Sequence, residues 1–303
     1  MYRFRFALLL LVAPAFSLAQ APVPLASRAP ADALDGPPLV TAKAWAIADG
    51  RTGQFLWGAK ESEPLTMAST TKIMTARIVL GLAAKNPKAL DETVTISERS
   101  AKTPGSSAKV RAGDRLPARE LLYGLLLPSG NDAAVALAEH FGKHFLDPKT
   151  TEATNEARFD AFVAEMNRQA QTLKMTNTKY LDPHGNSKNH TSARDLTQLA
   201  FDTLQDDRFR GYVNTRRHAY EVTAADGTKR PIVWENTNKL LEIEGFDGVK
   251  TGTTTAAGAC LVSTGVREGD RLIVVVLGCT SSDGRYVDAR NLYRWAWKER
   301  ARK

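Results

Sequence analysis

The chain has 303 residues, of which 43% are hydrophobic, enough for one large core or for two interlocked lobes. It carries 41 Lys and Arg against 33 Asp and Glu, and this net charge of +8 suits a protein that works on an anionic surface. No run of basic residues interleaved with aromatic ones is present, so we expect no nucleic-acid partner.

Residues 1–19 have the pattern of a secretory signal peptide. Arg3 and Arg5 supply the positive charge that precedes an apolar core, Phe6–Val12. Ser17–Ala19 then offers small residues at a cleavage site. Because the apolar run is too short to span a bilayer, we expect cleavage and export to the periplasm, the cell envelope or the medium. Removal of the two arginines lowers the net charge from +8 to +6.

Residues 20–41 are predicted to be a flexible linker. They contain five prolines among alanines and few side chains that could be buried. From residue 42 to Lys303 the sequence shows no second linker and no repeat, so we predict one folded domain at 42–303.

The folded part opens with a predicted hairpin. Two strand-like runs, Ala44–Ala48 and Gln54–Gly58, flank a glycine-containing turn. A helix follows within residues 64–80, where apolar side chains face nearly all directions, as in a helix buried at the centre of a domain. The next predicted elements are a strand at Thr93–Ile96 and helices at Ala118–Leu126, at Ala133–Phe141 with Asp132 as its cap, and around Phe159–Met166.

The last part of the chain is rich in strands. A long loop, Tyr180–His190, precedes it, and Ser192–Asp195 forms a capping box for a helix through Leu204. Strands at both ends with helices between them predict an α/β (α+β) fold, in which an antiparallel sheet is closed by the first and last segments and the middle helices form a second lobe. The predicted late elements are strands at Ala219–Thr223, Thr228–Trp234, Phe246–Thr251, Ala259–Val266 and Arg271–Gly278, and a helix from Asp283 to Glu299.

Ser69 and Lys72 are the strongest candidates for a catalytic pair. Residues three apart share one helix face, so the Ser69 hydroxyl and the Lys72 amine lie side by side at the start of the buried helix. A serine beside an amine can become a nucleophile without histidine, provided that the amine is neutral. Lowering the lysine pKa from about 10.4 to near 7 corresponds to about 4–5 kcal/mol, which burial and a second nearby cation can supply.

The spacing alone is weak evidence, because Ser106 and Lys109 repeat it in a turn-rich segment that we interpret as a solvated loop. Two further motifs strengthen it. Ser129-Gly130-Asn131 lies where a helix breaks, so its side chains can face a cleft. Lys250-Thr251-Gly252 occurs once, at the end of a predicted strand. Ser187 and Asn189 also fit the Ser-x-Asn pattern but lie in the irregular loop, and we do not assign them to the site.

With these motifs in this order, the chain resembles the D-alanyl-D-alanine carboxypeptidases, the low-molecular-mass penicillin-binding proteins that trim peptidoglycan. The resemblance extends over about residues 40–298 and is most specific around Phe246–Val262. It implies the DD-peptidase/β-lactamase fold, with an antiparallel five-stranded sheet flanked by helices and a helical lobe, over a catalytic domain at 42–303. It also implies peptidoglycan stem peptides as substrates, β-lactam antibiotics as inhibitors, and neither cofactor nor metal.

Chemistry and this resemblance together suggest the catalytic roles. Ser69 attacks the carbonyl carbon of the D-Ala-D-Ala bond and becomes an acyl-enzyme, while neutral Lys72 takes its proton. Lys250 is the expected second cation, which lowers the pKa of Lys72 and binds the terminal carboxylate of the substrate. Ser129 is suited to relay a proton to the leaving amine.

The same resemblance suggests the substrate contacts. Asn131 holds an amide of the acyl chain, and the Thr251 hydroxyl shares the substrate carboxylate. Gly252 lets a ligand approach the edge of the strand. The backbone N–H groups of Ser69 and Thr253 form the oxyanion hole, where one donor contributes on the order of 10²–10³ in rate.

Other classes fit less well. A class A β-lactamase would need a Glu-x-x-Leu-Asn stretch, which is missing, and an aspartate where Gly130 stands. A histidine-based hydrolase would need a Gly-x-Ser-x-Gly elbow, and the five histidines stand in ordinary surface or loop contexts. His184 and His190 beside Asp182 lack metal-ligand spacing. A non-catalytic wall-binding module would not need an intact Ser69–Lys72 pair.

A D-Ala-D-Ala endopeptidase that cleaves cross-links is the main alternative. The chain ends just after the predicted Asp283–Glu299 helix, whereas the best-known carboxypeptidases of the family continue into a small β domain and an amphipathic anchor. The related endopeptidases stop at about this point. The tail Trp295–Lys303 is too short for such an anchor, so we expect a soluble enzyme after signal cleavage.

Cys260 and Cys279 lie nearly opposite each other on two paired strands. A disulfide is compatible with an exported protein. Cross-strand pairs inside a sheet rarely meet disulfide geometry, which favours two buried thiols. Both states remain open at this point.

Overall fold

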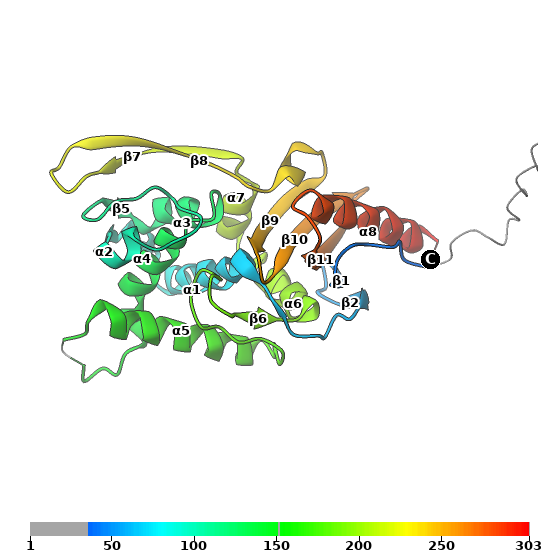
Figure 1. Cartoon of the computed structure of the whole chain (residues 1–303), viewed down its shortest axis with the longest axis horizontal. Helices are drawn as coiled ribbons and strands as arrows, with labels where there is room; N and C mark the ends of the chain where they lie inside the picture. The colour runs from blue at the N-terminus through cyan, green and yellow to red at the C-terminus, as the bar shows by residue number, and fades with distance from the viewer. Residues whose placement is uncertain (1–35, 151, 303) are drawn as a thin grey trace, which may run out of the picture. The chain divides into compact units, whose positions relative to one another are not determined.

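The computed structural model describes residues 36–150 and 152–302 (Figure 1). The predicted signal peptide at 1–19 and most of the predicted linker at 20–41 lie outside the described residues.

A five-stranded antiparallel sheet forms the part of the fold that the first and last segments share. Its strand order is β2-β1-β11-β10-β9, and Ala46 of β1 pairs with Val275 of β11. The predicted closure of the sheet by the two ends of the folded part is therefore confirmed. The strands are β1 (Ala44–Asp49), β2 (Phe55–Ala59), β9 (Phe246–Thr254), β10 (Gly258–Arg267) and β11 (Asp270–Cys279).

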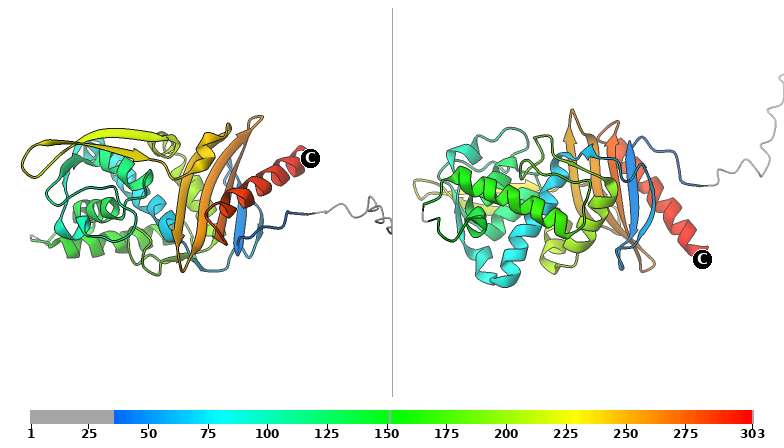
Figure 2. Two further views of the ribbon diagram at one scale, coloured as in Figure 1. Left: turned by 45° about the horizontal axis from the view of Figure 1, so that its top comes forward. Right: turned by 90° about the horizontal axis from the view of Figure 1, so that it is seen from below.

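Both faces of this sheet are covered, so its central strands are buried on both sides and read as apolar runs. Helix α8 (Gly284–Ala301) packs on one face, where Leu292, Tyr293 and Ala296 are fully buried. Helix α6 (Ala193–Thr203) packs on the other face, on the side of the helical lobe (Figure 2).

The helical lobe surrounds helix α1 (Lys72–Lys85), whose buried side chains point in nearly all directions, as expected. Its first residues continue a short 3-10 helix, η2 (Ala68–Thr71), so Ser69 precedes the α-helix. The remaining helices are α2 (Glu98–Ala101), α3 (Ala118–Leu126), α4 (Asn131–Phe141), α5 (Asn155–Thr172) and α7 (Asp207–Asn214), with 3-10 turns η3 (Pro87–Asp91), η4 (Gly142–Phe145) and η5 (Lys239–Glu242).

Two small sheets lie on the surface of the helical lobe. The long hairpin of β7 and β8 extends along the top of the lobe in Figure 1 and pairs with β5, so it does not join the main sheet. Strands β3 and β6 form a short pair beside α1. The strands are β3 (Leu65–Thr66), β4 (Thr93–Thr95), β5 (Arg115–Pro117), β6 (His190–Thr191), β7 (Arg217–Thr223) and β8 (Lys229–Glu235).

One predicted cap is wrong. Helix α4 begins at Asn131 and its N-cap is Gly130, so Asp132 lies inside the first turn. The Asp132 carboxylate instead accepts hydrogen bonds from the Ser107 hydroxyl at 2.6 Å and from the Ala108 N–H at 2.8 Å. It ties the preceding loop to the helix rather than closing the helix end.

The two cysteines are free, buried thiols, so the favoured alternative is confirmed. A β-bulge shifts the register between Ala259 and Leu261, and Cys279 pairs with Ala259 rather than with Cys260. Burial raises the pKa of the Cys260 thiol to about 11 and also raises that of Cys279. Neither thiol is a reactive thiolate near pH 7.

Candidate active site

Ser69 and Lys72 meet where η2 runs into α1. The Lys72 amine lies 3.0 Å from the Ser69 hydroxyl oxygen. The Lys72 side chain is fully buried, whereas Ser69 keeps partial exposure. A substrate can therefore reach the hydroxyl while the amine stays out of bulk water.

The other contacts of the Lys72 amine fix the direction of its lone pair. The nitrogen lies 2.7 Å from the Asn131 side-chain oxygen and 2.9 Å from the His184 carbonyl oxygen. The Asn131 amide nitrogen donates to the Pro104 carbonyl at 2.7 Å, which fixes the orientation of the amide. Both partners of the amine are thus acceptors. A neutral amine spends its two hydrogens on them, and its lone pair then faces the Ser69 hydroxyl.

Burial lowers the pKa of Lys72 to about 7, which makes such a neutral amine available near neutral pH. The nearby carboxylates of Asp182 and Asp132 act in the opposite direction and raise the pKa. Burial is therefore the leading cause, and the expected contribution of Lys250 stays a prediction.

Ser129 and Asn131 occupy the break between α3 and α4, as expected. Ser129 has a φ of 67°, in the left-handed region that a non-glycine residue adopts at a cost of about 1–3 kcal/mol. Its buried hydroxyl oxygen has no hydrogen-bond partner among the described residues. The backbone of Ser129 is thus strained, and its buried hydroxyl is available to form a hydrogen bond with a substrate.

The third motif lies on β9, which is an edge strand of the main sheet. Lys250 and Thr251 are buried, whereas Thr253 is exposed. The Thr251 hydroxyl lies 2.7 Å from the hydroxyl of Thr237, a residue that the sequence did not point to. The Lys250 amine donates to the Thr251 carbonyl at 3.1 Å.

Gly252 is needed for a further reason besides the expected approach of a ligand, which stays a prediction. A Cβ at this position would lie 2.8 Å from the backbone nitrogen of Ser69 and 3.0 Å from Ala68 Cβ. The segment that approaches the strand is thus the nucleophile's own backbone. This contact brings the N–H groups of Ser69 and the end of β9 to one place.

The two site lysines affect each other's charge. Burial lowers the pKa of Lys250 well below its usual value, and the positive charges of Lys72 and Arg285 lower it further. Because two cations repel each other equally, protonation of one disfavours protonation of the other. A state in which both amines are charged is therefore disfavoured.

Arg285, in the first turn of α8, was missed by the sequence analysis. It is 7% exposed, and one guanidinium nitrogen donates to the Thr253 hydroxyl at 2.9 Å and to the Gly252 carbonyl at 3.2 Å. It holds the end of β9 in place from the opposite face of the sheet. An arginine opening an otherwise apolar helix face was the only signal in the sequence.

The loop 180–190 also belongs to the site. His184 lies in this loop, as expected, but it is buried beside the catalytic pair rather than placed at the surface. His184 is 9% exposed, and burial lowers its pKa to about 4, so it is neutral at pH 7. Asp182 organises the loop by accepting from the N–H groups of His184 and Ser187 at 2.8 and 2.6 Å. Asn189 is buried and donates to Asp182 and Thr71, which makes it a structural residue of this loop.

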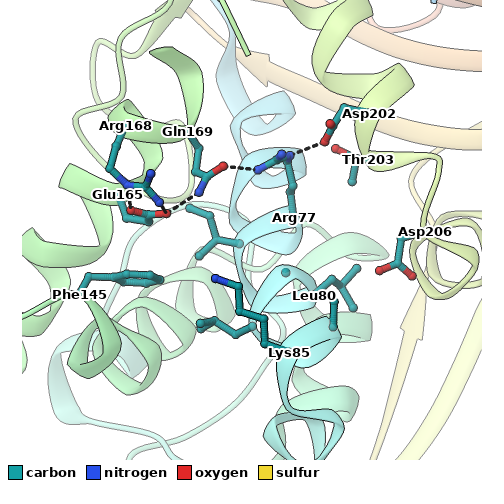
Figure 3. A pocket seen from close by; sticks show the side chains of 14 residues that line it. Arg77, Leu80, Lys85, Phe145, Glu165, Arg168, Gln169, Asp202, Thr203 and Asp206 are labelled. Carbon is teal, nitrogen blue, oxygen red and sulfur yellow. Dashed lines mark hydrogen bonds and ion pairs between the residues drawn. The ribbon is translucent and has the colours of Figure 1, made fainter. Parts of the chain in front are cut away.

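A separate hollow of about 310 Å³ lies along the C-terminal half of α1, against α5 and α6 (Figure 3). Its charged side chains mostly pair with one another: Arg77 donates to Asp202 at 2.5 Å and to Gln169 at 2.6 Å, and Glu165 accepts from Arg168. These bonds join three helices, so we assign the hollow to the packing of the lobe. Among the described residues, no group of three or more His, Cys, Asp or Glu could hold a metal ion.

The model of one protein family, described as D-alanyl-D-alanine carboxypeptidase (peptidase S11), matches residues 32–281. The chain belongs to this family. Its members are serine peptidases, and the three motifs described above all fall within the matched range.

Relatives within the family carry different names. The D-alanyl-D-alanine carboxypeptidase of Streptomyces sp. strain K15 is 35% identical over 276 residues, covering 88% of this chain and 91% of that protein. The crystal structure of the Streptomyces K15 DD-transpeptidase matches with a TM-score of 0.79 and 34% identity, covering 87% of this chain and 99% of that one. The D-alanyl-D-alanine endopeptidase of Escherichia coli is 29% identical, covering 96% of this chain and 86% of that protein.

Several family carboxypeptidases are longer than the matched region. The chain spans 62% of DacF from Bacillus subtilis, at 30% identity, and 64% of DacD from Escherichia coli, at 33% identity. The fold expected from the resemblance is confirmed by the solved neighbours and by the five-stranded sheet.

Proposed function

We propose that the protein is a serine D-alanyl-D-alanine carboxypeptidase that removes the terminal D-Ala of peptidoglycan stem peptides through an acyl-enzyme on Ser69. The observation that carries the proposal is the Lys72 amine, 3.0 Å from the Ser69 hydroxyl and with a pKa of about 7. Its two other contacts are acceptors, which leave its lone pair to the serine proton.

Acylation then needs groups from the start of α1 and from β9. Lys72 takes the proton as Ser69 attacks the carbonyl carbon, and the N–H groups of Ser69 and Thr253 stabilise the oxyanion. Lys250 and Thr251 bind the terminal carboxylate of the substrate. That carboxylate favours the charged form of the Lys250 amine and so raises its pKa.

Collapse of the tetrahedral intermediate breaks the peptide bond. The leaving nitrogen of D-alanine receives a proton through Ser129, whose hydroxyl has no competing hydrogen-bond partner in the described part of the chain. Water then hydrolyses the ester and restores the Ser69 hydroxyl. Asn131 holds Lys72 in place during both steps and contributes to binding of the acyl chain.

The proposal includes the location and the domain boundaries. Residues 1–19 form a signal peptide that directs export and is removed, and residues 20–41 form a linker. Residues 42–303 form the catalytic domain, which acts in the periplasm or cell envelope. Its substrates there are peptidoglycan stem peptides, and β-lactam antibiotics inhibit it. Among the described residues, no helix is both long and apolar enough to cross a membrane. Amino-terminal sequencing of the protein recovered from the cell envelope tests the boundary: an intact Met1 contradicts it.

The acyl-enzyme is tested by intact-mass measurement after incubation with benzylpenicillin. We expect one added drug mass on the tryptic peptide that contains Ser69, and none in Ser69→Ala. An adduct on Ser106 or Ser129 would overturn the assignment. Release of free D-alanine from a pentapeptide ending in D-Ala-D-Ala, measured with a D-amino-acid oxidase, tests the reaction itself.

An endopeptidase is the second candidate, because two relatives that the chain covers well, from Escherichia coli and Pseudomonas aeruginosa, are named D-alanyl-D-alanine endopeptidases. The two activities share the acyl-enzyme and differ in the group that leaves. If cross-linked muropeptide dimers fall to monomers while the pentapeptide stays intact, the endopeptidase assignment replaces the first.

A further inference from the structure

A second hollow, of about 800 Å³, lies where two turns of the main sheet meet the last turns of α8. The turn after β1 and the turn between β10 and β11 form one wall, and α8 forms the other. In Figure 1 this part of α8 lies at the C-terminal end of the chain, away from the helical lobe. We call it the basic groove; its lining residues with charge are Arg51, Arg267, Glu268, Asp270, Arg294, Lys298 and Arg300.

Five cations therefore face two carboxylates in the basic groove. Arg300 neutralises Asp270 at 2.8 Å and also pairs with Asp49 at 2.7 Å. Arg294 and Lys298 are exposed and have no ion-pair partner among the described residues. The groove therefore keeps an excess of positive charge that no carboxylate among the described residues neutralises.

The wall of the groove is held in place before any ligand arrives. The Arg51 guanidinium donates to the Gly269 carbonyl, and the Gly50 N–H donates to the Arg271 carbonyl at 2.8 Å. The first bond connects the two turns and the second ties the turn after β1 to β11, so the backbone of this wall is fixed. A preformed site loses less conformational entropy on binding than flexible side chains do.

The composition of the groove favours a polymer over a membrane. Trp297 lines the groove, but its ring packs against Phe246 and Tyr293. The large, exposed apolar side chains of the described residues are Leu39, Leu181, Val233, Ile243 and Val287, and none of them lines the groove. A surface that inserts into a bilayer presents such side chains beside its cations. Arginine guanidinium groups instead match phosphate oxygens in pairs. A concave wall also suits an extended chain better than a flat lipid surface.

We propose that the basic groove binds a linear polymer of closely spaced phosphates and so holds the enzyme against an anionic matrix. Arg285 at the catalytic site and Lys298 in the groove stand on the same helix, about 20 Å apart at 1.5 Å per residue. The polymer therefore occupies the groove while the cleft at Ser69 stays open.

Binding is measured with the full chain and short-chain inorganic polyphosphate, by titration calorimetry at several salt concentrations. We expect affinity that falls as salt rises, because the contacts are exposed charges. The double variant Arg294→Glu/Lys298→Glu should bind about tenfold more weakly or worse. The double variant Lys88→Glu/Lys179→Glu changes the net charge equally on exposed residues elsewhere, and should bind as the unaltered protein does. Equal losses of affinity in both double variants would contradict the proposal that polyphosphate binds in the basic groove.

Two further arms separate the sources of phosphate. Orthophosphate at equal phosphate concentration should fail to compete, since a single phosphate spans only part of the groove. Stronger binding to phosphatidylglycerol vesicles than to polyphosphate, lost in the same variant, would show that the groove binds a membrane and would overturn the polymer proposal.

Benzylpenicillin acylation of Ser69 should be unchanged in Arg294→Glu/Lys298→Glu. If that variant does not fold, Arg267→Gln/Lys298→Gln serves in its place. Because acylation is a separate readout, the groove and the catalytic proposal can fail independently.

Discussion

At the scale of single residues, the protonation state of Lys72 sets the expected pH dependence. With a pKa of about 7, the amine is charged and inactive below that pH and neutral above it. The rate of acylation by benzylpenicillin should therefore rise with pH through a midpoint near 7 and then level off. Stopped-flow measurements across this range test the prediction, and a rate that falls over the same range contradicts it.

Lys250→Ala tests whether the second lysine shares in this effect. Removing a nearby cation makes protonation of Lys72 easier, so its pKa should rise and the midpoint of the acylation profile should move upward. The rate at pH 7 should fall as a result. An unmoved midpoint with weaker substrate binding would leave Lys250 only as a contact for the carboxylate.

Arg285→Ala tests the support of the strand end from across the sheet. Its loss removes a charge-assisted hydrogen bond to Thr253, of the kind that contributes about 1.5–3 kcal/mol. Acylation should slow by about 10- to 100-fold. Arg290→Ala is the matched control, because Arg290 lies on the same helix and has no ion-pair partner among residues 36–150 and 152–302. Equal losses in both variants would point to the stability of α8.

At the scale of elements, the start of α1 is confined by the loop 180–190. Gly185 has a φ of +93°, and a Cβ there would lie 1.9 Å from the Ala68 carbonyl oxygen. Gly185→Ala should therefore displace the loop, lower the melting temperature and slow acylation. Gly81 lies on α1, and no atom of the described residues is within 4 Å of a methyl group added there, so Gly81→Ala should stabilise the folded state by about 0.5–1 kcal/mol. Thermal unfolding of both variants checks the contrast.

The sequence predicted those elements whose signals are local. The strands of the main sheet, α1 and the three motifs follow from apolar periodicity, glycine positions and spacing, and the structure places them close to the expected ranges. The path of the loop 180–190 could not be predicted, because its irregular backbone is set by bonds to Asp182 rather than by periodicity. For the same reason, nothing in the sequence indicated that the His184 carbonyl contacts Lys72.

Contacts between segments that are distant in the sequence could not be predicted either. Arg285 and Gly252 are 33 positions apart, and only the packing of α8 on the sheet brings the guanidinium beside the end of β9. Asp132 looked like a helix cap because its position suited one, yet the nearby loop offers its carboxylate better donors. A pattern limited to neighbouring residues cannot report either arrangement.

At the scale of the whole molecule, the site combines groups from the helical lobe and from the main sheet. Ser69 and Ser129 belong to the lobe, and Lys250 to the sheet edge. A penicilloyl group on Ser69 should contact both and stabilise the folded state. The melting temperature should rise by about 2–4 °C for each kcal/mol gained, whereas Ser69→Ala with the same drug should show no rise. A lower melting temperature of the acylated protein contradicts the bridging role.

The pairing of β1 with β11 governs the order in which the chain can fold. Residues 44–59 emerge from the ribosome early, but the strand beside β1 is complete only at Cys279. Until then a nascent chain holds an apolar hairpin with no neighbour, and pairings of such large sequence separation form slowly. The main sheet therefore cannot close during most of the synthesis of the chain, and the catalytic cleft, which needs Lys250 of β9, assembles only when the last strands arrive.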